Sequence, residues 1–175
     1  MRTILHYGSL MNNNLLTTPT KPVEYIDKQV HLHIQQMNAV LGNFGKSAAG
    51  LAANQIGKNV RIFVYNDRNH TGPRAIINPY IVNGEGKHFD IEGCLSFPDT
   101  WAVVERFKNV TVRYVDFYTL NEKVEDFEGF DARLFQHEIE HLDGEIFINN
   151  LTEEDKNEFL ARYARNNRSS KDPRR

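Results

Sequence analysis

The sequence predicts an α+β fold in which short antiparallel strands pack around a central helix that carries an HExxH motif. Three observations support this fold class. Residues 110–115, Val-Thr-Val-Arg-Tyr-Val, alternate apolar and polar side chains with the period of a half-buried strand. Helical periodicity occurs in three separate regions. Strands and helices do not alternate in the regular order that a parallel sheet requires.

The first half of the chain contains one expected helix and several expected strands. Asparagines, threonines and prolines dominate its opening up to Pro22, so we expect a surface loop there. An N-terminal helix is expected to begin after Asp27, a suitable cap, and to end near Gly42. Short apolar runs predict one strand over 60–65 and two short strands over 75–82, broken at Asn78-Pro79.

The second half contains the central helix and a short C-terminal helix. Asp131 is a plausible cap for the central helix, and Asp143-Gly144 ends its apolar stripe. Thr152 and Asp155 resemble a capping box, which predicts a last helix through Tyr163. We therefore expect a single catalytic domain over residues 1–165 and a flexible basic tail over 166–175.

The composition excludes several classes of protein. A chain of 175 residues with 40% hydrophobic content can form one domain with a substantial core. Its formal net charge of -2 argues against a general DNA or membrane binder. The single cysteine excludes an intramolecular disulfide, and no apolar run approaches the roughly 20 residues that span a bilayer. Because the N-terminus does not resemble a signal peptide, we expect a cytoplasmic protein.

The strongest chemical signal is the HExxH sequence at residues 137–141. On a helix, His137 and His141 lie one turn apart, so both imidazoles can bind one metal ion. Glu138 would then lie beside that ion and could transfer protons during hydrolysis. The alternative is a polar helix face that carries two histidines by chance.

A third metal ligand is required, and two known metalloprotease patterns do not supply it. The extended motif HExxHxxGxxH would need a histidine where Phe147 stands, and no glutamate lies far enough downstream for a thermolysin-like site. The remaining soft donor is Cys94, within Glu-Gly-Cys-Leu-Ser at 92–96. A thiolate and two imidazoles suit zinc or ferrous iron. The alternative for Cys94 is a small buried hydrophobic residue.

Three motifs together resemble those of the peptide deformylase family. Residues 48–55, Ala-Ala-Gly-Leu-Ala-Ala-Asn-Gln, are similar to its GxGLAAxQ motif. Residues 92–96 match EGCLS completely, and 136–144 are similar to QHExDHLxG. The likeness extends from about Ile4 to Leu151. Three positions depart from the family pattern: Ala48 replaces a glycine that can adopt positive φ, Glu140 replaces an aspartate, and Trp101 stands where smaller or basic residues are common near the pocket entrance.

The resemblance implies a metal-dependent amide hydrolase that removes the N-formyl group from the N-terminal methionine of newly made polypeptides. It implies that Cys94, His137 and His141 bind one divalent transition metal, Fe²⁺ natively, with Zn²⁺ or another divalent ion possible in purified protein. Glu138 would transfer protons. The Gln55 side chain and the Leu95 backbone N–H would stabilise the oxyanion.

The resemblance also implies substrate-binding, supporting and partner roles. Gly50 would approach the substrate, and Phe130 and Leu134 would line the methionine pocket with His137. Glu92 and Arg106 would form a supporting ion pair. The expected partners are nascent formyl-Met peptides, with possible ribosome contact through the basic C-terminal tail. Two other functions remain open: a metallopeptidase, and a catalytically silent binder of formylated N-termini or ribosomes.

Overall fold

The structure, a computed structural model, describes residues 4–67 and 72–169. Its elements in chain order are α1 (Leu10–Leu16), α2 (Lys28–Phe44), β1 (Gly50–Ala52), β2 (Ile62–Asn66), β3 (Pro73–Glu85), β4 (His88–Cys94), β5 (Phe97–Arg106), β6 (Asn109–Asp116), β7 (Glu122–Glu128), α3 (Gly129–Leu142) and α4 (Glu153–Ser169). Short 3₁₀ turns cover Gly45–Ser47, Ala53–Ile56 and Phe147–Asn150. The predicted α+β class is confirmed.

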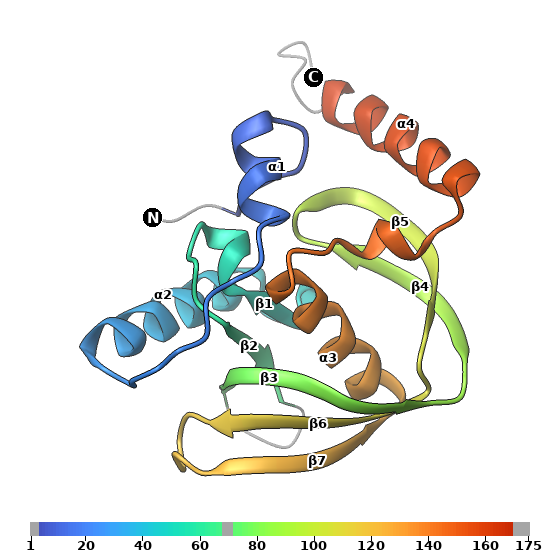
Figure 1. The fold of residues 1–175 in the computed structure, drawn as a ribbon. Coiled ribbons are helices and arrows are strands. Elements are labelled where there is room, and N and C mark those ends of the chain that lie inside the picture. The colour runs from blue at the N-terminus through green and yellow to red at the C-terminus, as the bar shows by residue number, and fades with distance from the viewer. Residues whose placement is uncertain (1–3, 68–71, 170–175) are drawn as a thin grey trace.

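Two antiparallel sheets enclose the central helix α3. Five strands pair in the order β1-β2-β3-β6-β7, and β4 pairs with β5 in a separate hairpin. Figure 1 shows α3 between the larger sheet and this hairpin, with α4 along β5. The predicted strand at 110–115 is confirmed as β6, whose buried residues alternate at Val110, Val112 and Tyr114. No helix in the described part of the chain is long and apolar enough to cross a membrane.

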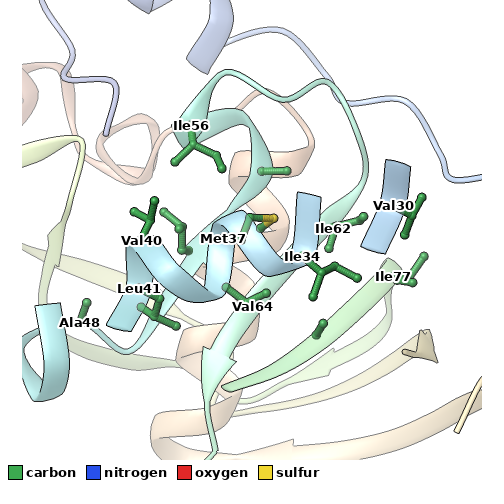
Figure 2. Close-up of a cluster of buried hydrophobic side chains, with 13 residues drawn as sticks. Val30, Ile34, Met37, Val40, Leu41, Ala48, Ile56, Ile62, Val64 and Ile77 are labelled. Atoms are coloured by element: carbon green, nitrogen blue, oxygen red, sulfur yellow. The ribbon is translucent and has the colours of Figure 1, made fainter. Parts of the chain in front are cut away.

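Helix α2 packs one apolar face against β1, β2 and β3. Figure 2 shows this cluster, in which Met37 and Leu41 of the helix lie among strand residues such as Val64. Asp27 caps the helix as expected, because its side chain accepts hydrogen bonds from the backbone N–H groups of Gln29 and Val30. The helix ends at Phe44 and not at Gly42, since Gly45, at φ 53°, is the residue that leaves the helical conformation.

The central helix α3 packs on the larger sheet through Phe135. The Phe135 ring lies 4.0 Å from that of Phe127 and 5.0 Å from that of Phe63, measured between centroids. The helix begins at Gly129, with Glu128 at the cap position, so the prediction that Asp131 caps it is wrong; Asp131 lies in the first turn instead. There its charge still complements the helix dipole.

Helix α4 and the hairpin share a third core built from aromatic rings. Phe97 of β5 contacts Phe147, Phe159 and Tyr163, with centroid distances of 5.1 to 5.7 Å. The predicted capping interaction is confirmed, since the Asp155 backbone N–H donates to the Thr152 hydroxyl at 3.2 Å.

Three expectations about segment boundaries are corrected. Residues 10–16 form helix α1 within the expected surface loop, because Ser9 caps it through the backbone N–H of Asn12. Residues 75–82 belong to one strand, β3, in which an irregularity between Ile77 and Tyr80 accommodates Asn78-Pro79. Residues 166–169, expected in the tail, continue α4, and Asn166 donates to the Asp99 carbonyl at 2.7 Å. The tail residues 170–175 lie outside the described residues.

Candidate metal centre and active site

Three potential metal ligands converge from two elements. Cys94 stands at the end of β4, and His137 and His141 lie one turn apart on α3. One donor atom from each side chain lies within 4.8 Å of the other two. The Cys94 Sγ and His141 Nε2 atoms are 3.1 Å apart, and both residues are buried. This group is a soft, three-donor site of the kind that holds zinc or ferrous iron.

The electrostatics of the site favour the ligand form of the cysteine. Burial alone would raise the pKa of the Cys94 thiol, but the imidazoles of His141 and His137 hold it well below its usual value. The backbone N–H of Ser96 also donates to Cys94 Sγ, at 3.4 Å. Because the thiolate is the form that binds metals, the residues present fit a divalent transition ion.

Glu138 is a buried carboxylate next to these donors. Burial raises the pKa of Glu138 to about 7. Its Oε2 atom is buried and has no hydrogen-bond partner among the described residues. Strand β1 approaches so closely that a Cβ added at Gly50 would lie 2.5 Å from Glu138 Oε1. A carboxyl group with a pKa near 7 and a free oxygen is suited to accept and return a proton.

Gln55 is held by hydrogen bonds at both ends of its side-chain amide. Its Oε1 atom accepts from the Ala52 backbone N–H at 2.9 Å, which fixes the direction of the amide. Its Nε2 atom donates to Ser96 Oγ at 3.2 Å and to Cys94 Sγ at 3.4 Å. The amide N–H groups therefore point towards the ligand cysteine. Sequence reasoning missed the contribution of Ser96, although this serine lies in the same motif as Cys94. Leu95 follows Cys94 directly in the β4–β5 turn.

An ion pair behind the site orients His137. Arg106 donates to both oxygens of Glu92, at 2.9 Å each, and Glu92 Oε2 also lies 3.0 Å from His137 Nδ1. The structure therefore contains the expected pair and links it to a metal-ligand candidate. Arg106 forms a second ion pair with Glu140, which sequence reasoning left without a partner. Asn150 donates to the same Glu140 oxygen at 2.9 Å.

Comparison with known proteins gives the same family across most of the chain. The family described as polypeptide deformylase matches residues 1–157. This chain belongs to the peptide deformylase family. A peptide deformylase from Treponema pallidum is 39% identical over 150 residues, covering 85% of this chain and 90% of the relative. One from Aquifex aeolicus is 40% identical over 148 residues, covering 79% and 83%.

Solved deformylase structures share the whole fold. The crystal structure of a peptide deformylase from Legionella pneumophila has a TM-score of 0.85 and 29% identity, and the likeness covers 99% of both chains. The family is metal-dependent, and this chain presents the three-donor group that such an enzyme needs. The chain is therefore a metal-dependent hydrolase of the deformylase family.

The remaining family-based residues lie on or beside α3. Leu134 is buried one turn before the ligand histidines, and its Cδ1 atom would lie 3.0 Å from a Cβ at Gly50. Phe130, one turn earlier, is 36% exposed. A groove of about 1090 Å³ lies elsewhere, between α2 and residues 117–118, and contains none of the site residues. The methionine pocket at Phe130 and Leu134 stays a prediction.

Proposed function

We propose that Cys94, His137, His141, Glu138, Gln55 and Leu95 form the catalytic site that removes the formyl group from N-terminal formylmethionine. The observation that carries the proposal is the position of Glu138. It is buried beside the three-donor group, has a pKa of about 7 and keeps one oxygen without a hydrogen-bond partner in the described part of the chain. Such a carboxyl group can act as base and then as acid in a single hydrolytic cycle.

Cys94, His137 and His141 would hold one divalent transition ion. When bound, that ion supplies Lewis-acid activation of water and of the formyl carbonyl. We propose ferrous iron as the native ion, with zinc or another divalent ion able to occupy the same donors, because a mixed thiolate and imidazole set suits both. Glu92 and Arg106 would support the site by fixing the orientation of the His137 ring.

The protein groups then divide the steps of amide hydrolysis. Glu138 takes the proton from the attacking water and returns it to the departing amine, so that formate and a free N-terminus are released. The Gln55 side-chain amide and the Leu95 backbone N–H stabilise the negative charge that develops on the formyl oxygen. Gln55 suits this role because the Ala52 backbone N–H fixes its amide, leaving the N–H groups directed at the site.

Close packing at Gly50 explains why a formyl group is the preferred acyl unit. A formyl carbon bears hydrogen where an acetyl carbon bears a methyl group and where an internal peptide bond bears a chain. Gly50 lies so close to Glu138 that even a methyl group on its own Cα would collide with the carboxylate. This close packing supports the proposal that an acyl group larger than formyl is excluded beside Glu138. Phe130 and Leu134 would contact the methionine side chain.

Steady-state kinetics on four matched peptides test this function. Formyl-Met and formyl-norleucine peptides should be cleaved at similar rates, because both side chains are long and apolar. Acetyl-Met and formyl-Asp peptides should be much poorer substrates, the second because an unpaired charge is costly to bury. Comparable cleavage of formyl and acetyl peptides, or cutting at internal bonds, would identify a metallopeptidase. Tight binding of formyl-Met peptides without turnover would identify a silent binder.

We also propose that the enzyme works in the cytoplasm on nascent formyl-Met chains and contacts the ribosome through its basic C-terminal residues. Residues 161–175 contain six basic residues and one acidic residue. Ribosome co-sedimentation of the full chain should weaken steeply with salt, whereas a chain ending at residue 169 should bind less and depend less on salt. Equal binding by both chains would remove the tail from this role.

A further inference from the structure

The β4–β5 hairpin exposes an unusually apolar face to solvent. Strand alternation directs Glu92 and Cys94 to the buried side of the hairpin. On the opposite side Phe89, Ile91, Trp101 and Val103 are 62%, 64%, 56% and 57% exposed. We call these four residues the outer hairpin face. Antiparallel sheets that face water on one side normally carry polar residues there, so an apolar face of this kind indicates a binding surface.

The outer hairpin face is continuous and begins beside the active site. Ile91 pairs directly with Val103, and Gly93 pairs with Trp101. The Trp101 indole occupies the space left by the missing side chain of Gly93, since a Cβ there would lie 2.6 Å from both Cδ1 and Nε1. Gly93 immediately precedes the ligand candidate Cys94. The face therefore starts at the Gly93–Trp101 pair, one residue along β4 from Cys94 and on the opposite side of the strand, and extends along the hairpin to Phe89.

We infer that the outer hairpin face binds the downstream part of the polypeptide substrate through apolar side chains of that chain. The inference rests on the proposed function, because only a long substrate anchored by its first residue has a downstream part. Such a chain must leave the site across the protein surface. Cys94 and the outer hairpin face lie on opposite sides of β4, and this strand has no strand partner on its second edge in the described sheets, so a chain can pass that open edge from one side to the other.

The dimensions of the face define the part of the substrate that it can contact. Neighbouring strands lie about 4.8 Å apart and an extended chain advances about 3.3 Å per residue, so a chain leaving beside Cys94 can cross β4 within two to three residues. The stretch from Gly93 to Phe89 then contains five residues of β4 and is about 13 Å long, so it can lie beside roughly five extended substrate residues. Alternate side chains of that stretch would face the hairpin.

The charges near the face favour apolar segments over charged ones. Glu105, opposite Phe89, pairs with Lys87 at 2.8 Å. Paired charges of opposite sign give no long-range attraction for an acidic or basic segment. A nascent chain is unfolded when it is deformylated and therefore exposes apolar residues that a folded protein would bury. The expected substrate preference is for apolar residues at alternate positions from about the fourth to the eighth.

A matched pair of peptides tests this preference. Both peptides have eight residues, begin with formyl-Met-Ala-Ser and carry lysine at positions five and seven. The apolar peptide has valine, leucine and phenylalanine at positions four, six and eight, and the control peptide has serine at all three. We expect the apolar peptide to have a KM at least fivefold lower with little change in kcat. The tripeptide formyl-Met-Ala-Ser separates the two proposals. If it is not deformylated the proposed function fails, whereas cleavage of all peptides with equal KM overturns only this inference.

Two threonine substitutions make the centre of the outer hairpin face polar without weakening the strands. Ile91→Thr combined with Val103→Thr keeps β-branched side chains and should reduce the fivefold KM difference to less than twofold. Val124→Thr is the matched control, because Val124 is 59% exposed on β7, outside the hairpin. It should preserve the fivefold difference. The same KM ratio between the two peptides in the double variant and in the control variant would contradict the inference.

The single tryptophan of the chain provides a binding signal that does not depend on turnover. Trp101 is the only tryptophan, so its emission reports directly on the outer hairpin face. Titration of the metal-loaded Glu138→Gln protein with the apolar peptide should shift the emission to shorter wavelength, and the serine peptide should not. Unchanged emission with both peptides would overturn the inference. The inference would also be overturned if sedimentation showed a dimer for the unchanged protein and a monomer for the double variant, while the KM difference between the two peptides stayed the same.

Discussion

Replacing Gly50 with alanine tests how closely β1 must approach the Glu138 carboxylate, the proposed catalytic group. The added Cβ would lie 2.5 Å from Glu138 Oε1, 2.9 Å from its Cδ and 3.0 Å from Leu134 Cδ1. Ordinary non-bonded contacts between carbon atoms begin near ~3.5 Å, so the carboxylate must move by on the order of 1 Å. The backbone at Gly50 has no positive φ that would strain alanine, and the effect therefore comes from the collision alone.

The magnitude follows from the required displacement. A misplacement of about 1 Å at a reacting group costs roughly 100-fold in rate. At about 1.36 kcal/mol per factor of ten, this loss corresponds to about 2.7 kcal/mol in the activation free energy. Overpacking of this kind also lowers the free energy of unfolding by about 1 to 3 kcal/mol. The expected outcome is thus a slow enzyme that still folds and still binds metal, since Cys94, His137 and His141 are not displaced.

The assay combines kcat on a formyl-Met peptide, metal content and thermal unfolding. Gly42→Ala is a matched control, because Gly42 lies in helix α2 and a Cβ there meets no atom within 4 Å. It should leave kcat unchanged and raise the free energy of unfolding by about 0.5 to 1 kcal/mol, as alanine does in a helix. Wild-type kcat in Gly50→Ala would refute the reasoning. It would mean that Glu138 tolerates displacement or does not act in catalysis.

Three further predictions concern metal binding, proton transfer and acid stability. Anaerobically purified protein should hold roughly one transition ion per chain, and Cys94→Ala should lose most of it; full metal content in this variant would remove Cys94 from the site. Glu138→Gln should bind the ion normally and lose at least ~100-fold in kcat; an empty site would instead make Glu138 a ligand. Burial raises the pKa of Asp116, but hydrogen bonds from Thr119 and the ion pair with Arg74 outweigh it and lower that pKa below its ordinary value. The stabilisation by Asp116 is therefore present above a pH of about 3.9 and is lost as pH falls through the folded-state pKa. Asp116→Asn should reduce the free energy of unfolding by about 1.5 to 3 kcal/mol at neutral pH, and urea titrations should show this difference shrinking in acid; a difference independent of pH would contradict the assignment.

Local patterns predicted helix α3 well because its motif and its end both lie within one stretch of sequence. The HExxH spacing and the Asp143-Gly144 stop are both read along α3 itself. Strands β1, β4, β5 and β7 were not predicted. Strand β7, Glu-Lys-Val-Glu-Asp-Phe-Glu, is too acidic to read as a strand and forms through its pairing with β6. Strand β5 has the alternating burial of a strand, but Pro98, its second residue, obscures where it begins.

The third ligand and the supporting charges could not be derived from local patterns. Cys94 and His141 are 47 residues apart, and only tertiary packing of β4 against α3 brings them together. Residue chemistry alone left Cys94 as either a metal ligand or a small buried hydrophobic residue. The family resemblance favoured the metal ligand. The replacement of the family glycine by Ala48 puts a positive φ at this position in doubt, and its φ is indeed −127°, an extended conformation that alanine tolerates. The orientation of Gln55 by Ser96 also depends on atoms far apart in sequence.

The replacement of the family aspartate by Glu140 has a structural consequence for the metal ligands. Arg106 is buried and forms ion pairs with two carboxylates, Glu92 and Glu140. These two negative charges offset the cost of burying the guanidinium. Glu140 also accepts from Asn150, so the 3₁₀ turn after α3 is tied to the same arginine. Arg106 in turn fixes Glu92, which lies 3.0 Å from His137 Nδ1. A proton held on Nδ1 by this carboxylate leaves Nε2 as the lone-pair nitrogen, which is the form of imidazole that binds a metal. If His137 binds the metal, its ligand tautomer is therefore set by a chain of charges that begins at the partly buried Glu140.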